Sequence, residues 1–176
     1  MFFNSRKYPM NKPYLLIIIL VLFFTSFNAS KLFAQNDKQN YTLSINQKEI
    51  ERLHDTVIFK KKYFVSYITI KLSNNSTIAL NYITYSCSWD DLFHSNNKAI
   101  EVCQSPCESN YPIVKSLAVR KIEVFILPVI LKKRLSDIRF KIGMNLFLDN
   151  AANRQLFPLP VDKLDNVIWS NEVKLP

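Results

Sequence analysis

The chain has 176 residues, a formal net charge of +9 and a single glycine, Gly143. One glycine excludes the Gly-rich loop that cradles phosphates and the Gly-x-Ser-x-Gly turn that presents a catalytic serine. The positive charge would suit nucleic acid, but part of it lies in an N-terminal segment that has the features of an export signal.

Residues 1–34 have the pattern of a cleavable signal peptide. Basic residues come first, the apolar run 14–24 follows, and small and polar residues end the segment. The apolar run is shorter than the roughly 20 residues that a membrane-spanning helix needs. We expect cleavage between Ala34 and Gln35, which leaves 35–176 as one domain. An uncleaved N-terminal membrane anchor is the alternative.

Removal of this segment changes the charge of the protein. The segment holds four of the 23 basic residues and none of the 14 acidic residues, so the net charge falls from +9 to +5. Such a charge is ordinary for a soluble domain. We therefore expect a protein exported to the periplasm or the extracellular space, with no membrane span after processing.

The rest of the chain alternates apolar and polar residues in short runs rich in β-branched and aromatic side chains, which predicts strands. Residues 46–55 form either a short helix or a polar strand and loop, and 150–160 is a longer connection. Pro128 marks a strand edge or a bulge, because proline cannot donate a ladder hydrogen bond. The expected strands are 41–45, 56–59, 63–72, 78–89, 99–102, 119–131, 138–148 and 167–169.

Seven or eight strands at this spacing predict an all-β fold of two packed antiparallel sheets. An immunoglobulin-like Greek-key sandwich is the first interpretation, and a jelly roll or a small barrel is the alternative. The Asn-rich stretch 73–77 is expected to be a turn between two of the long strands, since asparagine tolerates positive φ and bonds its own backbone.

The cysteines Cys87, Cys103 and Cys107 lie in one segment, 84–112. An exported chain meets an oxidising compartment, so a disulfide is expected, and an odd number leaves one thiol over. Cys87–Cys107 with Cys103 left over is the preferred pairing, and Cys87–Cys103 is the alternative. A Cys103–Cys107 bridge would close a very tight loop. Either bridge to Cys87 is worth about 3 kcal/mol in the chain-entropy treatment.

The same segment places Asp90, Asp91 and His94 beside the thiols. Zinc sites combine two closely spaced ligand pairs, whereas the cysteines offer one Cys-x₃-Cys pair, so we expect no metal and no other cofactor. The other histidine after the signal segment, His54, lies in a polar context without a recognisable nucleophile and acid. These patterns favour a non-enzymatic protein.

Basic residues are interleaved with aromatic residues in 59–64, and a second basic stretch covers 132–141. Nucleic-acid-binding surfaces have this texture. Lysines on turns and edge strands also discourage aggregation, which is the interpretation we prefer, so no nucleic-acid partner is expected. A basic edge also suits anionic glycans or lipid headgroups, and a cell-surface glycan or anionic-surface binder is kept as a hypothesis.

Three stretches, 68–89, 107–117 and 121–128, resemble small exported immunoglobulin-like proteins of bacteria, many of uncharacterised function. They are also distantly similar to bacterial proteinase-inhibitor-like domains with an immunoglobulin-like sandwich. The similar region covers roughly 63–148. The resemblance implies a β-sandwich, and the inhibitor-like domains imply an exposed loop that enters a protease cleft.

The function that the sequence favours is an exported binding module stapled by one disulfide. Its partner would be an unknown protein or glycan at the cell envelope or outside, and a proteinase inhibitor is the alternative. Loops on a rigid sandwich commonly carry recognition, so 86–112 and 150–160 are the expected contact surfaces. The candidate contact residues are Trp89, Asp90, Asp91, Phe93, His94, Tyr111 and Phe157.

Overall fold

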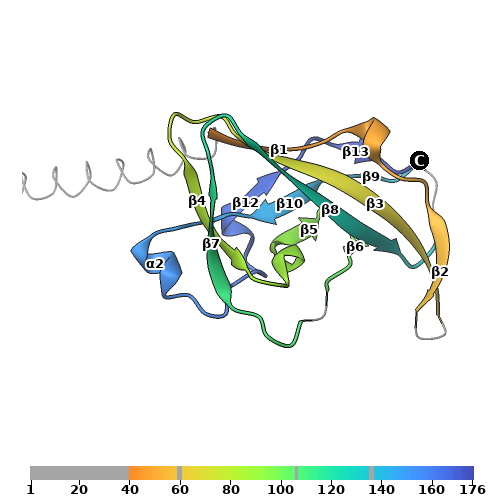
Figure 1. Cartoon of the computed structure of the whole chain (residues 1–176). Helices are drawn as coiled ribbons and strands as arrows, with labels where there is room; N and C mark the ends of the chain where they lie inside the picture. The colour runs from red at the N-terminus through yellow and green to blue at the C-terminus, as the bar shows by residue number, and fades with distance from the viewer. Residues whose placement is uncertain (1–39, 59–60, 106, 135–136) are drawn as a thin grey trace, which may run out of the picture. The chain divides into compact units, whose positions relative to one another are not determined.

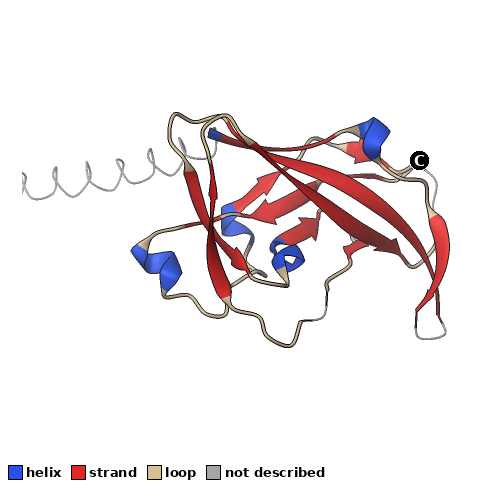
Figure 2. Cartoon of the chain, in the orientation of Figure 1, coloured by secondary structure: helices blue, strands red, loops and turns tan. Residues whose placement is uncertain are grey.

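A computed structural model describes residues 40–58, 61–105, 107–134 and 137–176, and most regular structure in them is β-strand (Figures 1 and 2). The expected signal segment 1–34 and its cleavage site at Ala34 and Gln35 lie outside these residues. The strands are β1 (Tyr41–Ile45), β2 (His54–Ile58), β3 (Lys61–Asn74), β4 (Leu80–Tyr85), β5 (Phe93–Ser95), β6 (Ile100–Val102), β7 (Pro112–Leu117), β8 (Ile122–Leu131), β9 (Arg139–Phe140), β10 (Ile142–Asn145), β11 (Phe147–Leu148), β12 (Val167–Trp169) and β13 (Val173–Lys174). The helical turns are η1 (Gln47–Glu49), η2 (Trp89–Leu92), α2 (Ala151–Arg154) and η3 (Leu164–Asn166).

The strand pairs are antiparallel, as expected, and form several sheets. The largest has the order β1-β3-β8-β6, with β2 pairing a further part of β3. Smaller sheets have the orders β11-β4-β7, β12-β10-β5 and β13-β9. The long strands β3 and β8 run side by side, and their continuations β4 and β7 pair with each other (Figure 1).

Alternation explains the two long strands. On β3 the fully buried apolar residues are Ile68, Ile70 and Leu72, two apart along the strand. The register sets Ile68 opposite Leu127 and Ile70 opposite Phe125, so both strands turn the same face to the core. Burying an aliphatic side chain of this size stabilises a fold by about 1.5–3 kcal/mol relative to exposure, so this shared face is a main source of stability.

Pro128 lies inside β8, opposite Tyr67 of β3. Its carbonyl accepts a hydrogen bond from Cys103 N–H at 2.8 Å. Because the N–H and C=O of one strand residue point to the same side, the proline nitrogen also points away from β3, and the ladder to β3 loses no bond. β6 pairs with β8 only from Val129 onward, so the earlier part of β8 is an edge.

The chain turns from β3 into β4 and from β7 into β8 at one corner, which Asn74 fixes. Its side chain is fully buried. Nδ2 donates to the carbonyls of Leu117 and Ala118 at 3.0 and 3.3 Å, and Oδ1 accepts from the N–H and hydroxyl of Ser76 at 3.0 and 2.7 Å. The turn expected at 73–77 therefore connects β3 to β4 and, through Asn74, is hydrogen-bonded to the connection between β7 and β8.

Two of the expected strands differ most from the structure in their extent. The strand expected at 138–148 is divided into β9, β10 and β11, which belong to three different sheets. All four residues of β10 are buried, so both of its faces are packed and alternation does not mark its ends. The strand expected at 78–89 ends at Tyr85, and the helical turn η2 follows. β7 had not been expected as a strand.

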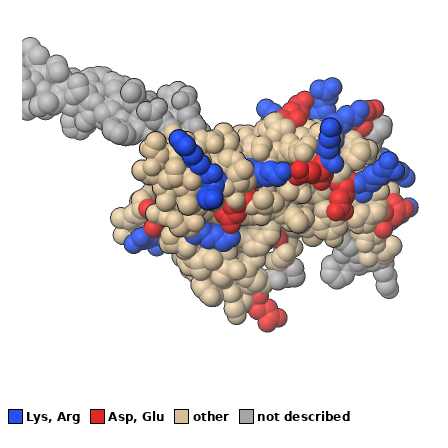
Figure 3. Space-filling model, turned by 45° about the horizontal axis from the view of Figure 1, so that its top comes forward, with Lys and Arg blue, Asp and Glu red and all other residues tan. Residues whose placement is uncertain are grey.

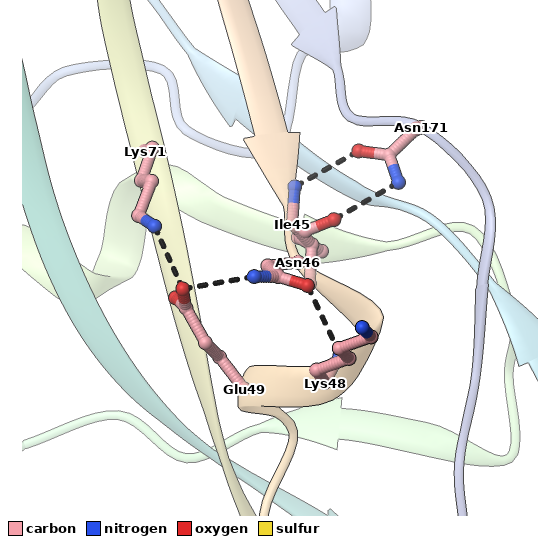
Figure 4. Close-up of polar contacts among 6 residues, drawn as sticks. All are labelled: Ile45, Asn46, Lys48, Glu49, Lys71 and Asn171. Atoms are coloured by element: carbon pink, nitrogen blue, oxygen red, sulfur yellow. Dashed lines mark hydrogen bonds and ion pairs between the residues drawn. The ribbon is translucent and has the colours of Figure 1, made fainter.

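Polar side chains hold the C-terminal end of β1 (Figure 4). Asn171 accepts from Ile45 N–H at 2.8 Å and donates to the Ile45 carbonyl at 3.0 Å, so at this residue one amide takes the place of a neighbouring strand. Beyond the strand, Glu49 accepts from Lys71 of β3 at 2.9 Å and from Asn46 at 3.0 Å. The C-terminal end of this edge is therefore occupied within the chain itself.

Candidate functional site

A disulfide joins Cys87 to Cys107, with Cα atoms 6.0 Å apart, and Cys103 is free and half-buried. This is the pairing that the sequence favoured. Within the described part of the chain, no group of three or more His, Cys, Asp or Glu side chains is arranged to hold a metal ion.

Two of the candidate contact aromatics pack inside the fold. Phe93 is buried, and its ring lies 5.2 Å from that of Phe125, centroid to centroid. Trp89 is half-buried and lies 6.0 Å from Phe93 and 5.5 Å from Phe125. Phe93 was expected as a contact residue, and in the structure its side chain is part of the core, with 2% of its surface exposed.

Asp90 is also buried, and its carboxylate is hydrogen-bonded to the loop that the disulfide closes. Its Oδ2 accepts from Ser105 N–H at 2.7 Å, while its Oδ1 has no partner among the described residues. Burial, followed by the charge of Asp90, raises the pKa of the neighbouring Asp91 above its usual value. Asp90 is therefore a loop anchor, and Asp91 is only half-buried beside it.

His94 is half-buried in a polar contact with β10. Nδ2 of the fully buried Asn145 lies 2.9 Å from His94 Nε2 and also donates to the Val161 carbonyl. Burial lowers the pKa of His94, while the Asp162 charge and the Val161 carbonyl oppose that shift. The other histidine, His54, stacks on Tyr67 at 5.9 Å on the outer side of the large sheet.

The two loops expected to form contact surfaces meet at a small pocket on the β4–β7 sheet. Pro112 ends the first loop, and Asn153, Arg154 and Leu156 come from the second. The pocket has a volume of about 150 Å³. Ile83, Ile113 and Val114 supply the rest of its lining. We call it the β7 pocket.

Exposed apolar side chains belong to the lining of the β7 pocket or to its neighbours in the sequence, with Tyr111 before Pro112 and Phe157 after Leu156. Tyr111 is 59% exposed, Val114 52%, Leu156 38% and Phe157 62%. Tyr111 and Phe157 were expected as contact residues, whereas Val114 and Leu156 were not. The sequence features that could have indicated these two residues are weak. Val114 lies in a six-residue alternating stretch that begins at Pro112, and Leu156 is one leucine in a Pro-containing connection. Water-exposed apolar groups gathered at one place are typical of an interaction surface.

The second loop is held rigidly against β4. Asp149 N–H donates to the Asn81 carbonyl at 2.9 Å, and Arg154 donates to both carboxylate oxygens of Asp149. Leu159 N–H donates to the hydroxyl of the buried Tyr85 at 2.8 Å. These contacts fix the loop at both ends, so the β7 pocket is already formed in the free chain.

A wider cleft of about 850 Å³ lies near the C-terminal strand. Three of its polar or charged lining residues, Gln47, Asp137 and Lys174, are paired with one another. Gln47 exchanges two hydrogen bonds with the backbone of Lys174, and Lys174 forms an ion pair with Asp137. Charges of both signs are also interspersed over the face in Figure 3, so no single sign dominates there.

No protein-family model, curated protein or solved structure matches the chain. Among the described residues, no helix is long and apolar enough to cross a membrane.

Proposed function

We propose that this protein is an exported, non-enzymatic binding domain that recognises a partner protein through the β7 pocket. The observation that carries the proposal is a pocket of one-residue size whose lining includes the exposed apolar residues Val114 and Leu156. The exposed Tyr111 and Phe157 are adjacent in sequence to lining residues. The pocket volume of about 150 Å³ is below the ~300–1,000 Å³ of most small-molecule sites. Protein interfaces, by contrast, commonly gain most of their affinity from one buried anchor side chain in such a pocket.

The proposed export rests on two supports. The N-terminal segment 1–34 has the pattern of a signal peptide. The Cys87–Cys107 disulfide is typical of proteins that mature in an oxidising compartment. The proposed location is therefore the periplasm or the extracellular space.

We propose also that the antiparallel sheets are an elaborated immunoglobulin-like Greek-key sandwich. Strands distant in the sequence pair at its centre, β3 with β8 and β4 with β7, as in folds whose strands return by long connections. The several short strands would be insertions at its ends.

Site-specific photocrosslinking tests the binding proposal. A photoreactive phenylalanine analogue at Phe157 should link the protein to a discrete partner in the envelope fraction of the producing cells. The same analogue at Ile78, equally exposed but at the corner turn, should not. Identical crosslinks from both positions, or none from either, would contradict the proposal.

A matched pair of substitutions sharpens this test. Val114→Asp places a charge at the β7 pocket, and Val124→Asp does the same on β8, where valine is 54% exposed against 52% for Val114. We expect Val114→Asp to remove the crosslink from position 157 and Val124→Asp to leave it. Circular dichroism of both variants checks that each is folded.

Proteinase inhibition is the second candidate, and one observation favours it. Gln104, Ser105, Glu108 and Ser109 are exposed around the half-buried Cys107. The disulfide and Asp90 hold this loop, and inhibitory loops need such restraint. Inhibition of a secreted protease that disappears when Asp90→Ala frees the loop would support this function. Full activity of every protease in a broad panel would reject it.

A further inference from the structure

The strand β7 is a free sheet edge. It pairs with β4 on one side, and among the described residues no strand lies along its other side. The first half of β8 continues the same free edge, whereas at the end of β1 the outward groups of Ile45 are bonded to Asn171. Free edges of natural sheets are usually blunted, because their unpaired backbone groups are templates for another strand.

The register identifies the backbone groups of β7 that face outward. Ser86 N–H donates to the Tyr111 carbonyl at 2.9 Å, and the pairing continues without a break to Leu80 opposite Leu117. Hydrogen-bonded and non-bonded pairs alternate in an antiparallel ladder. Ile113 and Lys115 therefore point their backbone groups at β4.

Alternation then leaves the N–H and C=O of Val114 and Ser116, with the C=O of Pro112, pointing to the free side. Both Val114 and Ser116 are exposed. The proline at the first position removes only one donor from this edge. Two residues with complete donor and acceptor sets remain there.

The β7 pocket lies directly beside these groups, because Val114 belongs to both. A residue opposite Val114 on an added strand would point its side chain to the same face as Val114. That face holds the pocket, which has room for one leucine side chain or one aromatic ring, since a cavity of about 150 Å³ accepts a benzene-sized group. No β8 residue lines it.

We propose, on the basis of the proposed function, that the partner supplies an extended peptide segment that adds to β7 as a further strand. Backbone hydrogen bonds to Val114 and Ser116 would hold the segment. One leucine-sized or aromatic side chain would enter the β7 pocket and set the register. This division is the one that strand-addition modules use, with backbone bonds for affinity and a side-chain pocket for specificity.

A second copy of this chain fits the edge less well than a partner peptide does. Pairing of β7 with itself in the register that uses both outward residues sets Ser116 of one copy opposite Val114 of the other. A hydroxyl side chain would then face the apolar pocket and leave it unfilled.

Two substitutions at position 116 distinguish the contribution of the backbone N–H to binding from that of the side chain. Ser116→Pro removes the outward N–H, and proline is tolerated on an edge strand when that N–H faces away from the ladder. Ser116→Ala removes only the hydroxyl. The probe is a set of fluorescent peptides of about ten residues selected from a random library, with binding measured by fluorescence anisotropy.

We expect selected peptides to have an extended pattern with one large apolar residue. Ser116→Pro should weaken their binding about tenfold, the value of one well-placed hydrogen bond. Ser116→Ala should change it less than about twofold. Exchange of the Ser116 amide should slow in the bound wild-type protein. This combination supports strand addition.

Other outcomes overturn it. Binding that Val114→Asp abolishes and Ser116→Pro leaves unchanged would keep the pocket as a binding site and reject the added strand. Failure of every library peptide to bind would reject the extended segment, while the Phe157 crosslinks would test the proposed function independently. Concentration-dependent dimers in sedimentation that Ser116→Pro dissociates would assign the edge to a second copy instead.

Discussion

At the scale of single residues, burial separates structural side chains from those proposed for recognition. Phe93 and Asp90 are buried and organise the disulfide segment, whereas Tyr111 and Phe157 are exposed and adjacent in sequence to residues that line the β7 pocket. The sequence placed all four in loops, but it could not show which loop residues turn inward. That depends on contacts with Phe125, which lies far along the chain.

His94 makes the stability of the fold depend on pH. Its ordinary pKa is near 6.5, and burial lowers it in the folded protein. Below about pH 6.5 the unfolded chain therefore binds a proton that the folded protein resists, so stability falls as the pH falls. Asp162, which faces the ring, moderates the effect.

Urea denaturation at about pH 7.5 and 5.5 measures this contribution. The free energy of unfolding should fall less on acidification in His94→Gln than in the wild-type protein. The same change at the exposed His54 serves as the control. If the free energy of unfolding fell equally on acidification in wild type and His94→Gln, protonation of His94 would not destabilise the fold.

Gly143 is needed for space. A Cβ at this position would lie 2.5 Å from Val167 Cγ1 and 2.8 Å from the Trp169 ring. Gly143→Ala should therefore destabilise the fold by about 1–3 kcal/mol, the usual cost of overpacking. The double variant with Val167→Ala should recover part of this loss in urea denaturation. A single variant as stable as wild type would refute the steric argument.

At the scale of elements, local alternation predicts long strands and fails for short ones. The expected strands 63–72 and 119–131 correspond to β3 and β8, whose partners and faces repeat regularly over many residues. β10 is buried on both faces, so its pattern carries no period. β7 was missed because Pro112 and Lys115 interrupt its six residues.

The corner between the two strand pairs depends on Asn74. Asn74→Ala would leave the carbonyls of Leu117 and Ala118 without their buried donor, and it should cost about 2–4 kcal/mol in thermal or urea unfolding. The neighbouring Asn75 is exposed and bonds only Thr42 through its side chain. Asn75→Ala should therefore change stability by less than about 0.5 kcal/mol. Equal losses in both variants would contradict the assigned role of Asn74.

At the scale of the whole unit, the long antiparallel ribbon positions both the core and the proposed recognition site. β3 and β8 form the core, and their continuations β4 and β7 carry the loops that form the β7 pocket (Figure 1). The all-β class was predictable from local pattern, and the disulfide from the expected export of the chain. The β7 pocket was not, because it requires the second loop to pack on β7 across about forty residues of sequence.

Amide hydrogen exchange of the free protein tests the open edge of β7 most directly. The amides of Ile113 and Lys115, directed at β4, should exchange slowly, and those of Val114 and Ser116, directed at solvent, should exchange much faster. Slow exchange at all four amides would mean that this edge is already covered, and the proposed recognition strand would have no place to bind.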